Sequence, residues 1–483
     1  MSASVAAKKD FTWLFVFIYL AIVALFFFVI PPIAPITEAG MRLLGVFIAA
    51  IFGWSIAQTE IWPSLLTFIL LPFVGLTNLS GILGLTWGTD TFLIIIFMMV
   101  LVGFLESSGA TVYVASFLMS RKFLLGHPWR LIFMIFLIAW ILSSFCGNFP
   151  GMFITWSFIY SICKALGYKP YEKFSNLLIF GVGVMGALSL SALPWAGNSL
   201  VILNAYAASS GTPVNYAHYL AYSLPYGLFS ILGFLLLCKF VFRMDVSKLK
   251  DFKPDFIAKE DLVLTPQRKI ALIATGVLIL LFVVPGILPA GNPVKTFLDS
   301  FGLTLKVIII FFALSLIKVD GQKVFDFHQL ASKNVPWNMV MMCVGILSFV
   351  GLLGKPEAGI SAFLGQVLTP LFQNTSVVFF FAITVLVTLI LTNFMINMVV
   401  AVIMIAAVVP ISATLGVPPL QIVYLITIVC TIAFMLPAAS AASCVLFANT
   451  AWIKAKDIYL YSVPTIIMLA LVAVIWNVIL FMF

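Results

Sequence analysis

The sequence predicts an all-α polytopic membrane protein. Hydrophobic residues make up 63% of the 483 residues and charged residues only 8%, whereas soluble globular chains carry about 25% charged residues. A helix needs roughly 20 apolar residues to cross the hydrocarbon core of a bilayer, so this composition suffices for about ten or more crossings. Little sequence is left for a large soluble domain. Soluble enzymes and nucleic-acid-binding proteins are therefore excluded.

Apolar runs bounded by proline, glycine or charged residues predict about eleven transmembrane helices. They lie near residues 12–30, 42–57, 62–76, 90–107, 177–208, 222–243, 269–289, 301–317, 336–353, 418–450 and 461–482. Two further apolar stretches, 131–163 and 376–413, have polar or helix-breaking residues at their middle. We predict that each is a re-entrant hairpin, which enters and leaves the membrane on the same side.

The distribution of lysine and arginine predicts the orientation, because these residues are enriched in cytoplasmic loops. With a cytoplasmic N-terminus and the C-terminus outside, all but four of the 25 basic residues lie on the inner face. The exceptions are Arg42, Lys295, Lys306 and Lys355. We therefore expect a multi-pass protein of the plasma membrane. Its net charge of +9 follows from topology and requires no nucleic acid or other polyanion as a partner.

The two predicted hairpins share a sequence pattern where they break. Residues 142–148 and 391–397 both read Leu-[Ser/Thr]-x-Phe-x-x-Asn. Each hairpin precedes a long apolar stretch that is interrupted midway, at 193–199 and at 436–443. An odd number of predicted crossings separates the two copies, so they have opposite orientations. Inverted repeats with interrupted helices are typical of secondary transporters, which bind their substrate near the bilayer midplane between the broken helix ends.

The interruptions locate the expected binding site. Non-helical backbone at that depth must line a cavity or be buried in protein, because lipid cannot satisfy its N–H and C=O groups. Unwound carbonyls and the oxygens of serine, threonine and asparagine suit a cation there. Helix N-termini and free N–H groups suit an anion.

At these residues the sequence resembles the divalent anion:sodium symporter family of dicarboxylate, citrate and sulfate carriers. The resemblance covers most of the chain, including the order of spans and hairpins and the stretch 433–437 before the second interruption. The family's hairpins carry Ser-Asn-Thr, and its broken helices carry a Thr-Pro-Pro-Asn-like turn. Here the hairpin tips read Gly-Asn-Phe at 147–149 and Ile-Asn-Met at 396–398, so only the asparagine is retained. Asn393 stands where the family often has glutamate.

The resemblance implies two sets of site residues. Substrate contacts are expected from Asn148, Phe149, Asn198, Asn397, Met398, Ser440 and Ser443. A sodium ion, the only cofactor expected, would be held by Ser143, Gly147, Asn148, Thr392, Met395 and Asn397. Phenylalanine and methionine in place of the two tip hydroxyls make the pocket more apolar. A substrate with a hydrophobic portion, or with fewer charges, is therefore favoured over sulfate.

The resemblance also implies a homodimer with an elevator mechanism, in which a scaffold stays fixed while the hairpins and broken helices move across the bilayer. We expect five parts in chain order. They are N-terminal scaffold helices (1–85), a first transport repeat (86–215, hairpin 131–163, broken helix 177–208), scaffold helices with a cytoplasmic loop at 244–268 (216–330), a second transport repeat (331–453, hairpin 376–413, broken helix 418–450) and a C-terminal helix (454–483).

Together these features predict a secondary active transporter of small organic anions such as di- and tricarboxylates, coupled to sodium, and not an enzyme. A sodium-independent anion exchanger, or a carrier of a more hydrophobic anion, is the alternative. A cation/proton antiporter is a further alternative, although it would be expected to keep a buried acidic pair near the breaks. The inverted broken helices disfavour a channel. A membrane-embedded enzyme would need clustered His, Asp, Glu or Cys at one membrane face, and the sequence offers no such cluster.

Overall fold

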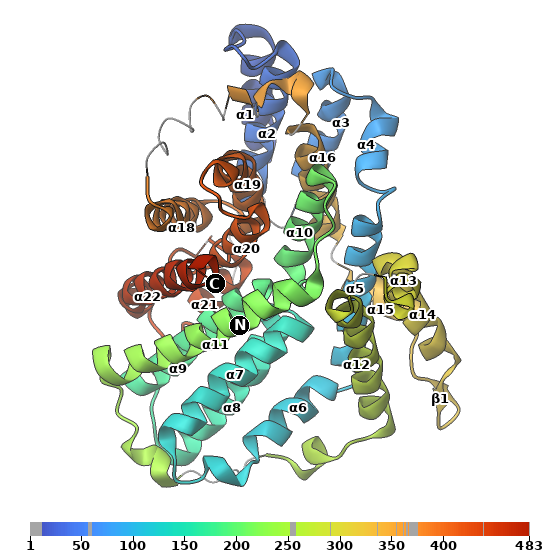
Figure 1. The fold of residues 1–483 in the computed structure, drawn as a ribbon. Helices are drawn as coiled ribbons and strands as arrows, with labels where there is room; N and C mark the ends of the chain where they lie inside the picture. The colour runs from blue at the N-terminus through green and yellow to red at the C-terminus, as the bar shows by residue number, and fades with distance from the viewer. Residues whose placement is uncertain are drawn as a thin grey trace, which may run out of the picture. The chain divides into compact units, whose positions relative to one another are not determined.

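The chain folds almost entirely into helices (Figure 1). The structure, a computed structural model, describes residues 12–56, 60–251, 257–289, 291–335, 337–353, 355–360, 362–363, 366, 375–437 and 439–482. The chain divides into two compact units. Unit 1 is formed by residues 1–88 and 337–370, and unit 2 by residues 89–336 and 371–483. Both hairpins and both interrupted helices belong to unit 2.

Unit 1 is a small helical bundle. Its elements are α1 (Thr12–Ala24) with a π-helical turn (Leu25–Val29), α2 (Glu38–Ile56), α3 (Trp62–Leu70) with a 3-10 turn (Leu71–Val74), α4 (Leu79–Leu85), α16 (Trp337–Leu353) and a 3-10 turn (Pro356–Ala358). The ring of Phe349 on α16 meets the rings of Phe47 and Trp54 on α2, with centroids 4.9 and 6.2 Å apart. The buried indole of Trp54 donates a hydrogen bond to Ser64 on α3 (3.0 Å). This aromatic cluster holds α16 against α2 and α3.

Unit 2 contains the first repeat and the helices that follow it. These elements are α5 (Asp90–Ser107), α6 (Ala110–Met119), a 3-10 turn (Lys122–Leu124), α7 (Pro128–Cys146), α8 (Asn148–Leu166), α9 (Lys173–Leu188), a 3-10 turn (Ser189–Ser191), α10 (Gly197–Ser210), α11 (Tyr216–Leu236) with a π-helical turn (Leu237–Val241), 3-10 turns at Ser247–Asp251 and Lys259–Leu262, α12 (Pro266–Ile287), α13 (Pro293–Ser300) and α14 (Gly302–Leu316).

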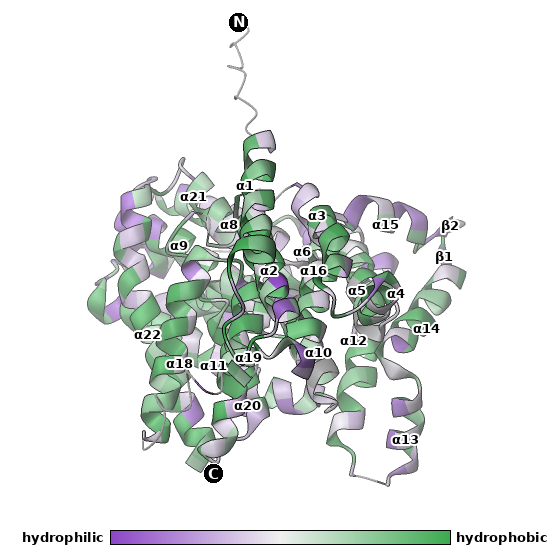
Figure 2. Ribbon diagram, turned by 90° about the horizontal axis from the view of Figure 1, so that it is seen from above, coloured by the Kyte–Doolittle hydropathy of each residue, from purple (hydrophilic) through white to green (hydrophobic). Residues whose placement is uncertain are grey.

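The remainder of unit 2 carries the second repeat. Its elements are an antiparallel pair of two-residue strands, β1 (Lys318–Val319) and β2 (Gln322–Lys323), then α15 (Phe327–Asn334), α18 (Val377–Phe394), α19 (Asn397–Thr414), α20 (Pro419–Val429), α21 (Ala441–Ala448) and α22 (Ala455–Met482). Figure 2 shows hydrophobic residues along most helices, whereas hydrophilic residues gather on α15.

The helices have the length and composition of membrane spans. Among the described residues, eight helices are long and apolar enough to cross a bilayer, or up to ten if each of two sharply bent helix pairs is one span. The polytopic all-α fold is therefore confirmed. The count of eleven crossings stays a prediction.

Each predicted hairpin is a pair of adjacent helices. In the first hairpin α7 and α8 lie side by side (Figure 1) and are joined at Gly147, whose φ of 84° and ψ of 153° form a conformation open essentially only to glycine. The arms approach closely where Gly151 faces Ser143, because a Cβ on Gly151 would lie 2.4 Å from the Ser143 nitrogen. The second hairpin, α18 and α19, turns instead through Met395 and Ile396, both with negative φ.

The hairpin arms are as long as spans. Each has 18 or 19 residues, which is about 28 Å at 1.5 Å per residue, close to the thickness of a bilayer core. A re-entrant hairpin and a pair of full crossings both return the chain to the face from which it entered. The predicted distribution of basic residues therefore holds for either arrangement.

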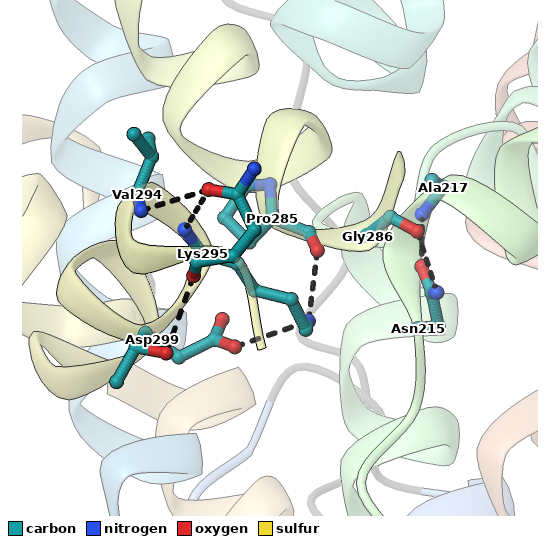
Figure 3. Close-up of polar contacts among 9 residues, drawn as sticks. Asn215, Ala217, Pro285, Gly286, Val294, Lys295 and Asp299 are labelled. Carbon is teal, nitrogen blue, oxygen red and sulfur yellow. Dashed lines mark hydrogen bonds and ion pairs between the residues drawn. The ribbon is translucent and has the colours of Figure 1, made fainter. Parts of the chain in front are cut away.

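Two sharp bends join predicted spans to short helices that the apolar pattern did not predict, α6 and α13. α5 and α6 meet at 59°, and α13 and α14 at 81°. The predicted span at 301–317 is thus α14, preceded by a short polar helix. Figure 3 shows how α12 ends beside this helix: Lys295 donates to the carbonyl of Pro285 (2.8 Å) and pairs with Asp299 (3.1 Å), while Asn215 donates to the carbonyl of Gly286 (3.0 Å). These bonds satisfy carbonyls that every helix end leaves free.

Candidate functional site

The first interrupted helix runs from α9 to α10, and its unwound backbone is satisfied mainly by side chains. Ser199 on α10 reaches back to donate to the carbonyl of Leu193 (2.7 Å). Helix α11 contributes two more donors one turn apart: Tyr219 donates to the Ser191 carbonyl (2.6 Å) and Ser223 to the Ala192 carbonyl (2.8 Å). The first break is therefore fastened to its own helix and to α11.

The second interrupted helix runs from α20 to α21 and contains a longer unwound segment. Ser440 donates to the Ala433 carbonyl (2.6 Å), and Ser443 donates to the Leu436 carbonyl (2.6 Å). As at the first break, a serine of the second half-helix bonds the carbonyl of the leucine that precedes proline.

The tip of the second hairpin provides the other partners of this segment. Thr392 donates to the carbonyl of Cys430. The adjacent Asn393 donates to the carbonyl of Ile432 (3.2 Å) and accepts a hydrogen bond from the backbone nitrogen of Met435 (3.1 Å). Three hydrogen bonds therefore tie the end of α18 to the second break.

The two breaks also contact each other. The hydroxyls of Ser191 and Thr431 are buried and lie 3.1 Å apart. Helix α10 packs against both α19 and α20, and α7 packs against α9 and against the 3-10 turn of the first break. The structure thus gathers both hairpins and both breaks, which come from different halves of the sequence, in one part of unit 2.

The three predicted asparagines all begin helices in this region. Asn148 and Asn397 are the first residues of α8 and α19, and Asn198 is the second residue of α10. Asn198 and Asn397 are each only 5% exposed. The Oδ1 of Asn397 accepts a hydrogen bond from Thr392 (3.0 Å). Within the described chain, the Nδ2 groups of all three have no hydrogen-bond acceptor, so three amide donors remain available at three helix N-termini.

The other predicted substrate contacts have varied surroundings. Met398 is buried on α19, and the hydroxyls of Ser440 and Ser443 already donate to backbone carbonyls. The side chain of Phe149 lies outside the described part of the structure. Substrate contact by these four residues stays a prediction.

Of the two hairpins, the second brings more of the predicted sodium ligands close together. The hydroxyl of Thr392 lies between the Asn397 Oδ1 and the Cys430 carbonyl, so three oxygens of the kind that hard cations prefer lie together. A full shell needs about five or six oxygens. At the first hairpin the Ser143 hydroxyl lies 3.5 Å from the Asn148 carbonyl, and Gly147 forms the tip. Met395 is half-buried at the end of α18.

Three residues that bond the unwound backbone, Asn393, Tyr219 and Ser223, were not among the predicted site residues. Asn393 was noted only as a departure from the family pattern, and Tyr219 and Ser223 not at all. A signal existed for the last two, because polar residues four apart on an apolar helix share one face. Among the described residues, no three His, Cys, Asp or Glu side chains are grouped as metal ligands.

Paired hairpins and interrupted helices, with their unwound backbone satisfied inside an apolar helical unit, are the arrangement typical of secondary transporters. A sequence profile of the citrate transporter family, CitMHS, matches residues 11–429. The chain belongs to this family, and its apolar helices are those of a multi-pass membrane protein.

Comparison with solved structures supports this fold. The YdaH transporter of Alcanivorax borkumensis, whose crystal structure is described as having an unusual topology, superimposes with a TM-score of 0.55 at 14% sequence identity and covers 97% of both chains. Together with the family match, this confirms the predicted resemblance to divalent anion:sodium symporters and their wider superfamily.

Two curated relatives come from Saccharomyces cerevisiae. The low-affinity phosphate transporter is 23% identical over 296 residues, and the inorganic phosphate transporter is 24% identical over 303 residues. These alignments cover 60% and 62% of this chain but only 30% and 29% of the two longer proteins.

Proposed function

We propose that the protein is a secondary active transporter of small organic anions of the di- and tricarboxylate type. The observation that carries this proposal is the set of three unengaged amide NH₂ donors, those of Asn148, Asn198 and Asn397, each in the first turn of a helix. Amide N–H groups donate hydrogen bonds to carboxylate oxygens. Helix N-termini add the positive end of the helix dipole, which favours a negative ligand.

We further propose that transport is coupled to sodium through the second hairpin. Thr392, Asn397 and the Cys430 carbonyl would provide ligands, and their oxygen chemistry fits a hard cation. A bound cation beside the asparagines would offset part of the substrate's negative charge. The family resemblance supports the same arrangement, together with an elevator movement and a homodimer.

Sodium-independent anion exchange is the second candidate, and a specific observation favours it. The carbonyls of Leu193, Ala433 and Leu436 already accept hydrogen bonds from serine hydroxyls. Because the protein's own hydroxyls already donate to these carbonyls, the carbonyls do not require a bound cation.

Uptake of labelled substrates into proteoliposomes tests the carrier proposal. The panel contains citrate, succinate and, because the yeast relatives are named as phosphate transporters, inorganic phosphate. Asn148→Ala and Asn397→Ala should abolish uptake of the organic anion, and Asn198→Ala should weaken it. Asn204→Ala is the matched control, since its amide bonds the Leu200 carbonyl of its own helix. Unchanged uptake by the first two variants would refute the site.

The coupling proposal needs a separate measurement in sodium and in choline buffer. Thr392→Ala and Ser143→Ala should raise the sodium concentration for half-maximal uptake more than they change apparent substrate affinity at saturating sodium. Equal transport by the wild type in sodium-free choline would overturn sodium coupling and support exchange.

Topology and assembly can be tested independently of transport. With a membrane-impermeant thiol reagent, a cysteine at position 214 should be labelled in intact cells, whereas a cysteine at position 170 should be labelled only in inside-out vesicles. A monomer that transports at full rate in dilute proteoliposomes would contradict a required dimer.

A further inference from the structure

An open cavity of unit 2 lies where three helix ends meet, and no hairpin-tip residue lines it. Its volume is about 480 Å³, and its lining comes from the start of α9, the end of α11 and the start of α22. This volume is within the roughly 300–1,000 Å³ typical of small-molecule sites. The residues that line it belong neither to the hairpins nor to the breaks.

The cavity contains charges of both signs. Lys173 of α9 and Asp457 of α22 line it, and within the described chain neither makes an ion pair. Asn176 donates to a carboxylate oxygen of Asp457 (3.1 Å), which orients that carboxylate. Lys454 adds a second cation, 5.1 Å from the centre of the Tyr171 ring that also lines the cavity.

A buried polar atom in the same lining lacks a partner. Asn176 is only 2% exposed, and its Oδ1 accepts no hydrogen bond from the described residues, although the Tyr461 side chain, which also lines the cavity, contacts the same amide. A buried acceptor without a partner costs about 1–3 kcal/mol. Asn176 and Asp457 therefore form an acceptor pair that a ligand with N–H donors would satisfy.

The remaining walls of the cavity are apolar and reach the protein surface. Val241 and Leu460 line the cavity and are 58% and 66% exposed. Exposed apolar side chains on a membrane protein contact acyl chains. Lys173, Lys454 and Lys456 lie at the starts of α9 and α22, as basic residues do near the headgroups of the cytoplasmic leaflet. The cavity thus combines an exposed lysine and a half-buried aspartate with an apolar, lipid-facing rim.

We propose that this cavity binds the headgroup of phosphatidylethanolamine. The primary ammonium donates to Asp457 and Asn176, the phosphodiester lies toward Lys173 and Lys454, and the acyl chains follow Val241 and Leu460. A phosphatidylcholine headgroup carries a quaternary nitrogen with no N–H to donate. Phosphatidylglycerol has no positive charge to pair with Asp457. The cavity therefore selects a headgroup by its ammonium as well as by its phosphate.

Native mass spectrometry of the purified full-length protein in detergent tests this proposal. The protein is titrated with phosphatidylethanolamine, phosphatidylcholine and phosphatidylglycerol of identical acyl chains, and with soluble glycerophosphoethanolamine. Phosphatidylethanolamine should bind about threefold or more tightly than the other two lipids, the scale of one partly exposed ion pair. Equal binding of the three lipids, or tighter binding of phosphatidylglycerol, would overturn the proposal. Equal binding of the soluble headgroup would assign the cavity to a free phosphoester.

Two variants distinguish the roles of Asp457 and Lys173. Asp457→Asn should abolish the preference for phosphatidylethanolamine over phosphatidylcholine, whereas Lys173→Gln should weaken the binding of all three lipids by a similar factor. Lys169→Gln, a nearby lysine outside the cavity, should leave binding unchanged. A retained preference in Asp457→Asn, with a melting temperature equal to that of the wild type, would contradict the assigned ammonium site.

Discussion

The two interrupted helices of unit 2 are held open by different partners. At the first break the partners outside the broken helix are Tyr219 and Ser223 of α11, which belongs to neither hairpin. At the second break the equivalent partners are Thr392 and Asn393, at the tip of the second hairpin. The second hairpin and second break therefore form one hydrogen-bonded body, whereas the first break is bonded to α11.

The two copies of the repeat do not make equivalent hydrogen bonds to their breaks. In the shared seven-residue motif, Ser143 and Ser144 occupy the positions of Thr392 and Asn393. Their hydroxyls donate to the carbonyls of Asn148 and Trp140, both within the first hairpin. The two serine hydroxyls of the first hairpin thus stay within that hairpin, whereas Thr392 and Asn393 both bond the second break. Two hairpins with similar sequences can consequently have similar backbones and yet make hydrogen bonds to different segments.

The largest expected effect comes from removing the bond between hairpin and break. Asn393→Leu keeps the side-chain volume but leaves the Ile432 carbonyl and the Met435 nitrogen without partners. We expect a loss of about 2–4 kcal/mol in the free energy of unfolding, because each buried orphan costs about 1–3 kcal/mol. Thermal unfolding of the purified protein measures it. Ser144→Ala, at the equivalent position, should cost less than half as much. Equal losses would remove the distinction between the repeats.

The hairpin tips should differ in their need for glycine. Gly147→Ala places a Cβ where φ is 84°, and we expect a destabilisation of about 1–3 kcal/mol. The second tip has no such requirement, since Ile396 has φ −62°. Gly276→Ala in α12 is the control for the added methyl group, because nothing lies within 4 Å of its Cβ position. Unfolding that is unaffected by Gly147→Ala would argue against the one-residue turn.

The role of α11 can be tested with a smaller change. Tyr219→Phe removes only the hydroxyl that donates to the Ser191 carbonyl, so we expect a loss of about 1.5 kcal/mol. The equivalent residue of the second repeat is Ser462 on α22, which follows Leu436 by as many residues as Tyr219 follows Leu193. Its buried hydroxyl has no partner in the described structure. Ser462→Ala should therefore be neutral or slightly stabilising, and a comparable loss there would contradict the asymmetry.

The smallest effect is expected where the breaks touch. Ser191→Ala removes the bond to Thr431, but the Thr431 hydroxyl still donates to its own helix at Ile428 (2.8 Å). No group is left without a partner, so the unfolding free energy should change by less than about 0.5 kcal/mol. A loss above 1 kcal/mol in the same thermal assay would show that the contact stabilises the pair of repeats.

Much of the fold was predictable because it depends on local pattern. Apolar runs of sufficient length predicted the helices, and the Leu-Pro pairs at Leu193 and Leu436 predicted the breaks, since proline cannot donate the helical hydrogen bond. The seven-residue motif shared by 142–148 and 391–397 predicted two hairpins. The 81° bend before α14 was not predicted, because a short helix capped by Asn292 is too brief to show a period.

The candidate site was predictable only in part. The three asparagines were identified from their place in the repeat and from the family resemblance. The bonds that hold the breaks were not, because Asn393 meets Ile432 and Met435 across about 40 residues of chain, and a local pattern contains no information on such pairings. Tyr219 reaches Ser191 from a different helix for the same reason.

The Ser191–Thr431 contact bears on whether the two halves of the protein can be expressed as separate chains. Both hydroxyls keep a backbone partner in their own half of the chain, Ser191 at Leu188 and Thr431 at Ile428, so neither half needs the other to satisfy this pair. The connection between α11 and α12, with its two 3-10 turns, joins the halves outside the apolar helices. A gene divided within that connection should encode two polypeptides that insert separately and associate in the bilayer, as two products of an ancestral duplication would have done.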